Sequence, residues 1–127
     1  MEFRENEAIY LQVADFVNEH IMRGKWVAGE KLPSVRELAA TLQVNPRTVV
    51  RAYEILQARD VISNKRGIGF FIDDNALEKI KRFSKEEFLS REMPELIKRL
   101  YLFDIPVSEI EKALKDYIKT LNQIKNI

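Results

Sequence analysis

The sequence predicts a mainly helical chain that carries one small β-hairpin and ends in a short, wholly helical segment. Three observations predict this fold class. Two short helices with strong start signals are separated by a tight turn. Two β-rich runs, 61–62 and 70–72, flank the glycine-bearing turn 64–69, and residues 76–127 contain no glycine. Together these features predict a winged helix-turn-helix domain over residues 1–75 and a helical segment over residues 76–127.

The first helix is predicted over residues 8–23, because apolar residues recur there at helical spacing. The residues expected on its inner face are Ile9, Val13, Phe16, Val17 and Ile21. Gly24 follows directly and is a suitable terminator.

The next two helices have start signals that can be recognised locally. Ser34 and Glu37 have the spacing of a capping box, in which each side chain bonds the backbone N–H of the other residue. Asn45 and Pro46 place a capping side chain before a proline whose missing N–H is not needed in the first turn. The residues expected on the core-facing sides of these two helices are Val35, Leu38, Ala39, Leu42, Val49, Ala52, Tyr53 and Leu56.

The second helix of this pair has the arrangement expected of a helix that reads the DNA major groove. If Arg47 defines zero on a helical wheel, Arg51 lies at about 40° and the apolar stripe at roughly 140–240°. Arg47, Thr48 and Arg51 therefore lie near the helix N-terminus and away from the core. In a helix-turn-helix unit these are the positions that contact base edges.

Two further features favour contact with the DNA backbone. Arg36 lies in the first turn after Ser34, where free N–H groups and the helix dipole attract anions. Lys65, Arg66 and Gly67 form the predicted wing, in which glycine allows close approach and the cations neutralise phosphate. A solvated surface hairpin is the alternative interpretation of the wing.

Composition excludes several other classes of protein. The chain of 127 residues has a net charge of +1, but the stretch from Lys31 to Gly69 holds seven basic residues against three acids. There is no cysteine, and His20 is the only histidine, so we expect no metal site, no cofactor and no catalytic residues. A charged N-terminus and the lack of long apolar runs predict a soluble, cytoplasmic protein with no membrane partner.

The stretch 29–72, GEKLPSVRELAATLQVNPRTVVRAYEILQARDVISNKRGIGFFI, resembles the DNA-binding domain of GntR-family regulators. IYLQ (9–12) and LPSVRELA (32–39) are the most specific parts, and the likeness covers about residues 8–73. The short helical tail is similar to the YtrA-type subfamily, in which the tail serves dimerisation. The resemblance implies a winged helix in which Arg36, Arg47 and Arg51 meet DNA, assisted by Thr48, Lys65 and Gly67.

The complete set of predicted DNA-binding residues is Ser34, Arg36, Arg47, Thr48, Arg51, Lys65, Arg66 and Gly67. Two positions depart from the family pattern. Asp60 and Gln43 stand where the family often has glycine. Aspartate tolerates the left-handed conformation, so we expect little cost at residue 60, and neither departure touches the proposed contacts.

The helical tail is predicted to pair two copies of the chain. The residues expected at the dimer interface are Leu96, Leu100, Ile110, Leu114, Tyr117, Ile118 and Leu121. A unit of about 50 residues cannot easily bury so much apolar surface alone. The alternative is a monomer whose tail folds back on the winged helix.

These observations predict a regulator that binds double-stranded operator DNA as a homodimer on a pseudo-palindrome, more often a repressor than an activator. A winged helix that serves only as a protein-interaction module is the alternative. The exposed arginines favour DNA, because a pure protein interface does not need them. An enzyme is a remote third interpretation, and the sequence identifies neither the operator nor any small-molecule effector.

Overall fold

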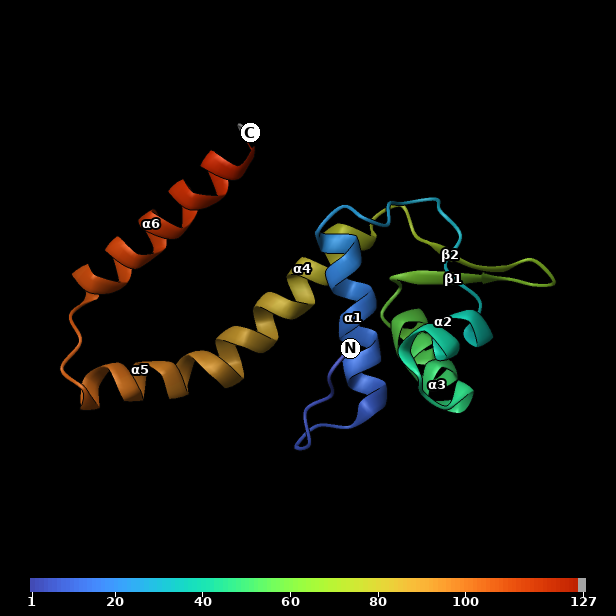
Figure 1. Cartoon of the computed structure of the whole chain (residues 1–127), viewed down its shortest axis with the longest axis horizontal. Coiled ribbons are helices and arrows are strands. Elements are labelled where there is room, and N and C mark those ends of the chain that lie inside the picture. The colour runs from blue at the N-terminus through green and yellow to red at the C-terminus, as the bar shows by residue number, and fades with distance from the viewer. Residues whose placement is uncertain (126–127) are drawn as a thin grey trace. The chain divides into compact units, whose positions relative to one another are not determined.

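The computed structural model describes residues 1–125, so Asn126 and Ile127 of the predicted helical segment lie outside the described residues. Figure 1 shows the order of the elements. In chain order they are α1 (Ile9–Met22), α2 (Val35–Leu42), α3 (Pro46–Ala58), β1 (Ile62–Lys65), β2 (Gly69–Ile72), α4 (Ala76–Glu87), the π-helix η1 (Phe88–Glu92), α5 (Met93–Leu102) and α6 (Val107–Lys125). The predicted fold class, a winged helix-turn-helix followed by helices, is confirmed.

The core of the winged helix is built around α3, which packs against α1 and α2. Its inner residues Val49, Tyr53 and Leu56 are fully buried, as predicted from their spacing. From α1, Val13 and Val17 are equally inaccessible. Burying such side chains contributes about 1.5–3 kcal/mol each and fixes α3 against its neighbours.

The wing is an antiparallel hairpin in which β1 pairs with β2, so that Ile62 faces Ile72 and Lys65 faces Gly69. The loop before α2 runs along the other edge of β2, with an isolated bridge between Lys31 and Phe71. The buried Ile62 and Ile72 anchor the base of the hairpin in the core. The wing therefore projects from a fixed base.

The chain divides into two compact units, Met1–Lys85 and Glu86–Ile127. The boundary thus falls later than residue 75, where the composition changes. The physical reason is that Ala76 and Ile80 of α4 are buried in the core of the winged helix. Lys79 strengthens this attachment, because its Nζ donates to the Asp60 carbonyl oxygen over 2.9 Å.

The segment before Pro94 is one continuous helical run with a local change of pitch. Between α4 and α5 the backbone forms η1, and the Met93 N–H donates to the Phe88 carbonyl five residues back. Proline lacks an N–H, and its ring clashes with the carbonyl four residues earlier, which here belongs to Ser90. A widened π turn accommodates that clash.

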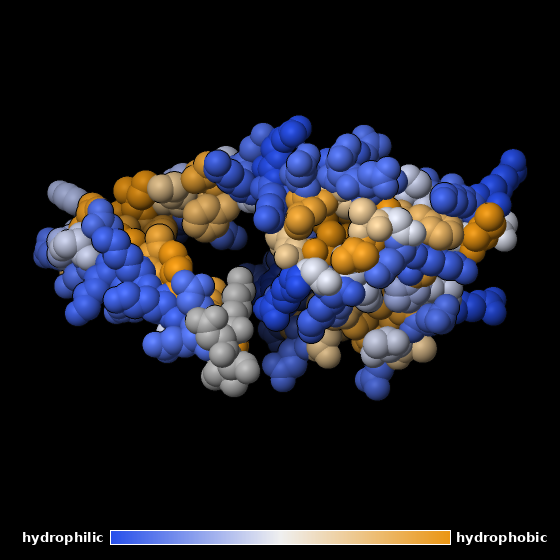
Figure 2. All heavy atoms as spheres, turned by 90° about the horizontal axis from the view of Figure 1, so that it is seen from above, coloured by the Kyte–Doolittle hydropathy of each residue, from blue (hydrophilic) through white to orange (hydrophobic). Residues whose placement is uncertain are grey.

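The second unit has helices without a core of their own. Residues 86–124 include no buried residue, and the partly covered ones are Met93, Leu100 and Ile105. Figure 2 shows hydrophobic side chains exposed on the surface of these helices. Within residues 1–125, every helix is too short or too polar to cross a lipid bilayer.

Candidate nucleic-acid interface

The predicted capping box is present and fixes the N-terminus of α2. The Glu37 N–H donates to Ser34 Oγ over 3.1 Å, and the Ser34 N–H donates to Glu37 Oε1 over 3.2 Å. These hydrogen bonds with Ser34 lower the pKa of Glu37 below its ordinary value. Arg36 is exposed in this first turn, next to the positive end of the helix dipole. The Ser34 hydroxyl accepts one bond and retains its own proton to donate.

A tight turn joins α2 to α3 and fixes where α3 begins. Gln43 adopts the left-handed conformation with φ 56°, which ends α2. The Asn45 side chain then accepts a hydrogen bond of 2.9 Å from the Arg47 N–H, and Pro46 occupies the first turn of α3. Both helix start signals predicted from the sequence are confirmed. The cap directs the first turn of α3 and its Arg47 away from the core.

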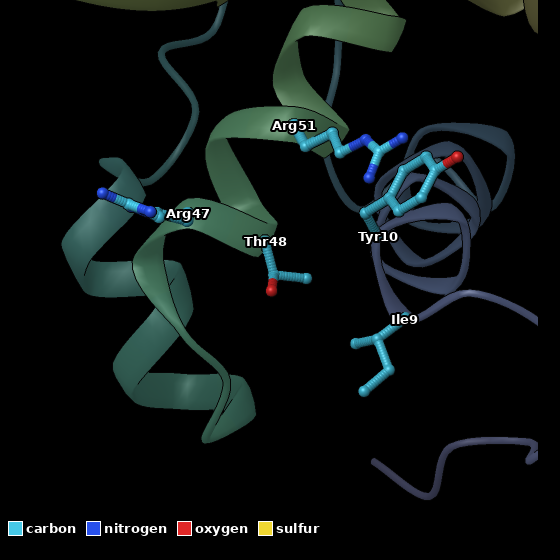
Figure 3. Close-up of a pocket in the computed structure, with 5 residues that line it drawn as sticks. All are labelled: Ile9, Tyr10, Arg47, Thr48 and Arg51. Carbon is cyan, nitrogen blue, oxygen red and sulfur yellow. The ribbon is translucent and has the colours of Figure 1, made fainter.

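The two arginines of α3 are exposed and point in different directions (Figure 3). The Arg51 guanidinium lies over the Tyr10 ring of α1, with its Cζ 3.8 Å from the centre of that ring. Arg47 extends to the opposite side, with Thr48 between them. An open hollow of about 320 Å³ lies here, lined by Ile9, Tyr10, Arg47, Thr48 and Arg51. The hollow is formed jointly by α1 and α3.

The wing presents its predicted cations beside a glycine tip. Gly67 has φ +79°, a left-handed conformation that glycine adopts at low cost, and no atom lies close to where a Cβ would be. Lys65 Nζ lies 4.3 Å from the centre of the Phe71 ring, which holds its ammonium group on one face of the hairpin. Arg66 is exposed at the tip.

Among the described residues, the cations of α2, α3 and the wing have no ion-pair partner. Every ion pair found among residues 1–125 lies in the N-terminal segment, in α1, or between residues 87 and 99. The side chains left without an ion-pair partner in the described chain include Arg36, Arg47, Arg51, Lys65 and Arg66. Unpaired exposed cations on one domain are what phosphate binding requires.

The structure adds three residues that the sequence alone did not assign to this surface. Ile9 was expected in the core, but its side chain is 45% exposed and lines the hollow, because it precedes the part of α1 that α3 covers. Tyr10 carries the stack with Arg51. Val50 of α3 is 41% exposed, and an apolar side chain there suits a thymine methyl group. A helical wheel of α3 alone places Val50 off the apolar stripe and could have found it.

The predicted dimer residues lie on α5 and α6. Leu96 is exposed on α5, and Leu100 is partly covered. The α6 residues Ile110, Leu114, Tyr117, Ile118 and Leu121 are all exposed in the single chain. A stripe of this length on an uncovered helix is available to a partner.

The fold and this basic surface define a winged-helix DNA-binding protein. Comparison with known proteins agrees: residues 9–72 match the family described as bacterial regulatory proteins, gntR family. The chain is 31% identical over 119 residues to the uncharacterised HTH-type transcriptional regulator YhcF of Bacillus subtilis, covering 91% of this chain and 94% of that protein. It is 30% identical over 113 residues to the transcriptional repressor YtrA of the same organism, covering 89% and 86%.

A crystal structure of a GntR-family regulator from Bacteroides thetaiotaomicron is similar to this chain with a TM-score of 0.73 and 42% identity, covering 90% of this chain and 99% of that one. The chain belongs to the GntR family, as a YtrA-like member. It is a DNA-binding transcriptional regulator and not an enzyme. Family membership thus favours DNA over the protein-interaction alternative.

Proposed function

We propose that the chain acts as a homodimeric repressor that binds a pseudo-palindromic operator through Arg47 and Arg51. The observation that carries this proposal is the pair of exposed arginines in the first two turns of a capped α3, free of ion pairs within the described chain. An arginine can donate two hydrogen bonds to O6 and N7 of guanine, which is the commonest specific contact in the major groove.

The remaining predicted residues divide by role. Thr48 lies between the arginines and is partly covered, and its short side chain suits contact with a base or sugar at close range. The residues assigned to phosphate contact are Ser34, Arg36, Lys65, Arg66 and Gly67. Phosphate contacts set affinity and register, whereas base contacts set the preferred sequence.

The partner of the exposed apolar stripe is a second copy of this chain. Residues 86–124 bury no side chain alone, and a unit of this size needs additional burial to be stable. A two-fold dimer lays the same apolar face of each copy against the other and so supplies the missing surface. It also relates two recognition helices by symmetry, which fits half-sites about 34 Å apart on one side of the duplex.

Repression, as opposed to activation, of transcription is inferred from the relative YtrA, which is described as a repressor and matches most of this chain. A dimer that covers about two turns of promoter DNA blocks access by polymerase without any further partner. Action on chromosomal DNA places this function in the cytoplasm.

The test is operator binding after selection from a random duplex library, measured by fluorescence anisotropy. Arg47→Ala and Arg51→Ala are each expected to cost about 1–3 kcal/mol, the worth of one bidentate pair with guanine, and to relax preference at one base pair. Arg36→Ala and Lys65→Ala are expected to weaken all sequences alike. Each should reduce the salt slope by about one unit, because one phosphate is no longer neutralised.

The matched control is Lys25→Ala/Arg82→Ala, which removes one exposed positive charge after α1 and one from α4, neither with an ion-pair partner among the described residues. It should bind the operator nearly as tightly as the wild type. Unchanged operator affinity for a folded Arg47→Ala/Arg51→Ala variant contradicts the proposal.

A further inference from the structure

We propose that Tyr10 is a positioning residue that holds the Arg51 guanidinium for base recognition, so that α1 takes part in sequence reading without contacting a base. This inference rests on the proposed function, because it concerns how one of the proposed reading residues is oriented.

The Arg51 guanidinium lies over the Tyr10 ring at cation–π distance. The Arg51 Cζ lies 3.8 Å from the centre of the Tyr10 ring, well within the range of about 6 Å over which the ring face attracts a cation. A cation–π contact of this kind engages the face of the guanidinium and leaves the N–H donors in its plane for other partners. Among the described residues Arg51 donates no side-chain hydrogen bond, so these donors remain available for a bidentate contact.

Tyr10 lies in the first turn of α1, and hydrogen bonds to the preceding segment hold this end of the helix in place. α1 has no capping side chain at Ala8, and instead the buried Gln12 amide secures the preceding segment. Gln12 Nε2 donates to the carbonyl oxygens of Arg4 and Glu7 over 2.8 and 2.9 Å, and its Oε1 accepts from the Arg4 N–H over 2.7 Å. Tyr10 therefore stands on a segment that is fixed relative to the core.

The same contact separates the two reading arginines. Arg51 lies against Tyr10 while Arg47 extends to the other side, with the hollow and Thr48 between them (Figure 3). A free arginine samples many rotamers, and ordering it on binding costs conformational entropy. With the stack in place, Arg51 meets the DNA already ordered, and its preferred base pair is distinct from that of Arg47.

The experiment measures the selected operator and a set of duplexes carrying single base-pair changes, using the full chain. The variants are Tyr10→Leu, Tyr10→Phe, Tyr10→Trp, Arg51→Ala and the Tyr10→Leu/Arg51→Ala double variant. Arg51→Ala is expected to lose about 5- to 150-fold of discrimination at one base pair. Tyr10→Leu should lose most of the same discrimination at the same base pair, and the double variant should match Arg51→Ala.

Tyr10→Phe and Tyr10→Trp keep a ring face and should retain the wild-type base preference. A purely structural role for Tyr10 would alter thermal unfolding and weaken every duplex equally, so the base-specific pattern distinguishes the two roles. If Tyr10→Leu does not fold, Tyr10→Gln takes its place, because glutamine has no ring face to offer Arg51. It should lose the same base-specific discrimination, and a folded Tyr10→Gln variant with wild-type discrimination contradicts the stack.

Three outcomes overturn the inference. One is a folded Tyr10→Leu variant with wild-type discrimination, and another is additive loss in the double variant. The third is a Tyr10→Phe variant that weakens all sequences uniformly, which identifies a hydroxyl–phosphate contact instead. If Arg51→Ala leaves base preference unchanged, the assignment of Arg51 in the proposed function fails as well, so the two failures are distinguishable.

Discussion

Leu114→Ala tests the proposed dimer at the centre of the α6 stripe. The Leu114 side chain is 58% exposed in the single chain, so that fraction of its surface is available to a partner. Complete burial of a leucine contributes about 1.5–3 kcal/mol, and the exposed part is therefore worth about 1 kcal/mol in each protomer. Two protomers lose about 2 kcal/mol together, which raises the dimer dissociation constant about 30-fold.

Sedimentation equilibrium over a concentration series measures this constant directly. The matched control is Lys112→Ala, which lies on the opposite side of α6 by helical geometry and should leave the constant unchanged. Circular dichroism of both variants checks that the winged helix is folded. A wild-type chain that sediments as a monomer at micromolar concentration refutes the reasoning, as does a Leu114→Ala variant with the wild-type constant.

Three further predictions concern the winged helix itself. Tyr53→Phe removes a 2.7 Å hydrogen bond to the Pro33 carbonyl and should lower the free energy of unfolding in urea by about 1–2 kcal/mol, with equal stability contradicting the role of that bond. Because the pKa of Glu37 is lower in the folded chain than its ordinary value of 4.5, its stabilisation is present above that value and is lost as the pH falls through the folded-state pKa. Glu37→Gln keeps an acceptor for the capping bond but does not titrate, so its stability should change less between pH 5 and 3; an unchanged pH profile argues against the capping box as the cause. Gly67→Ala forces a Cβ onto a residue at φ +79° and should weaken binding to all duplexes without changing base preference, whereas a shift in preference would mean that the wing reads bases.

The sequence was sufficient where structure is decided locally. The Ser34 and Glu37 capping box and the Asn45 and Pro46 helix start are confirmed, because each depends on residues a few positions apart. The left-handed conformation of Asp60, φ 59°, is likewise confirmed and needs only a residue that tolerates it.

Features that depend on tertiary packing could not be predicted in the same way. The helical wheel put Ile9 on the inner face of α1, but the wheel does not show how far along α1 the core extends. The contact of Arg51 with Tyr10 joins two helices that are separated in sequence by the whole of α2 and its flanking turns. No short-range sequence pattern predicts such a contact. The boundary after Lys85 depends on Ala76 and Ile80 reaching the core, which the change in composition conceals.

Genomic footprinting of the purified chain beside a folded Arg47→Ala/Arg51→Ala variant tests the central claim most directly. We expect the wild type to protect a few promoter sites with two-fold related half-sites about one helical turn apart. The variant should give no selective protection at those sites. Equal protection by both proteins, or protection without sequence preference in the wild type, contradicts the claim that α3 reads operator DNA through these two arginines.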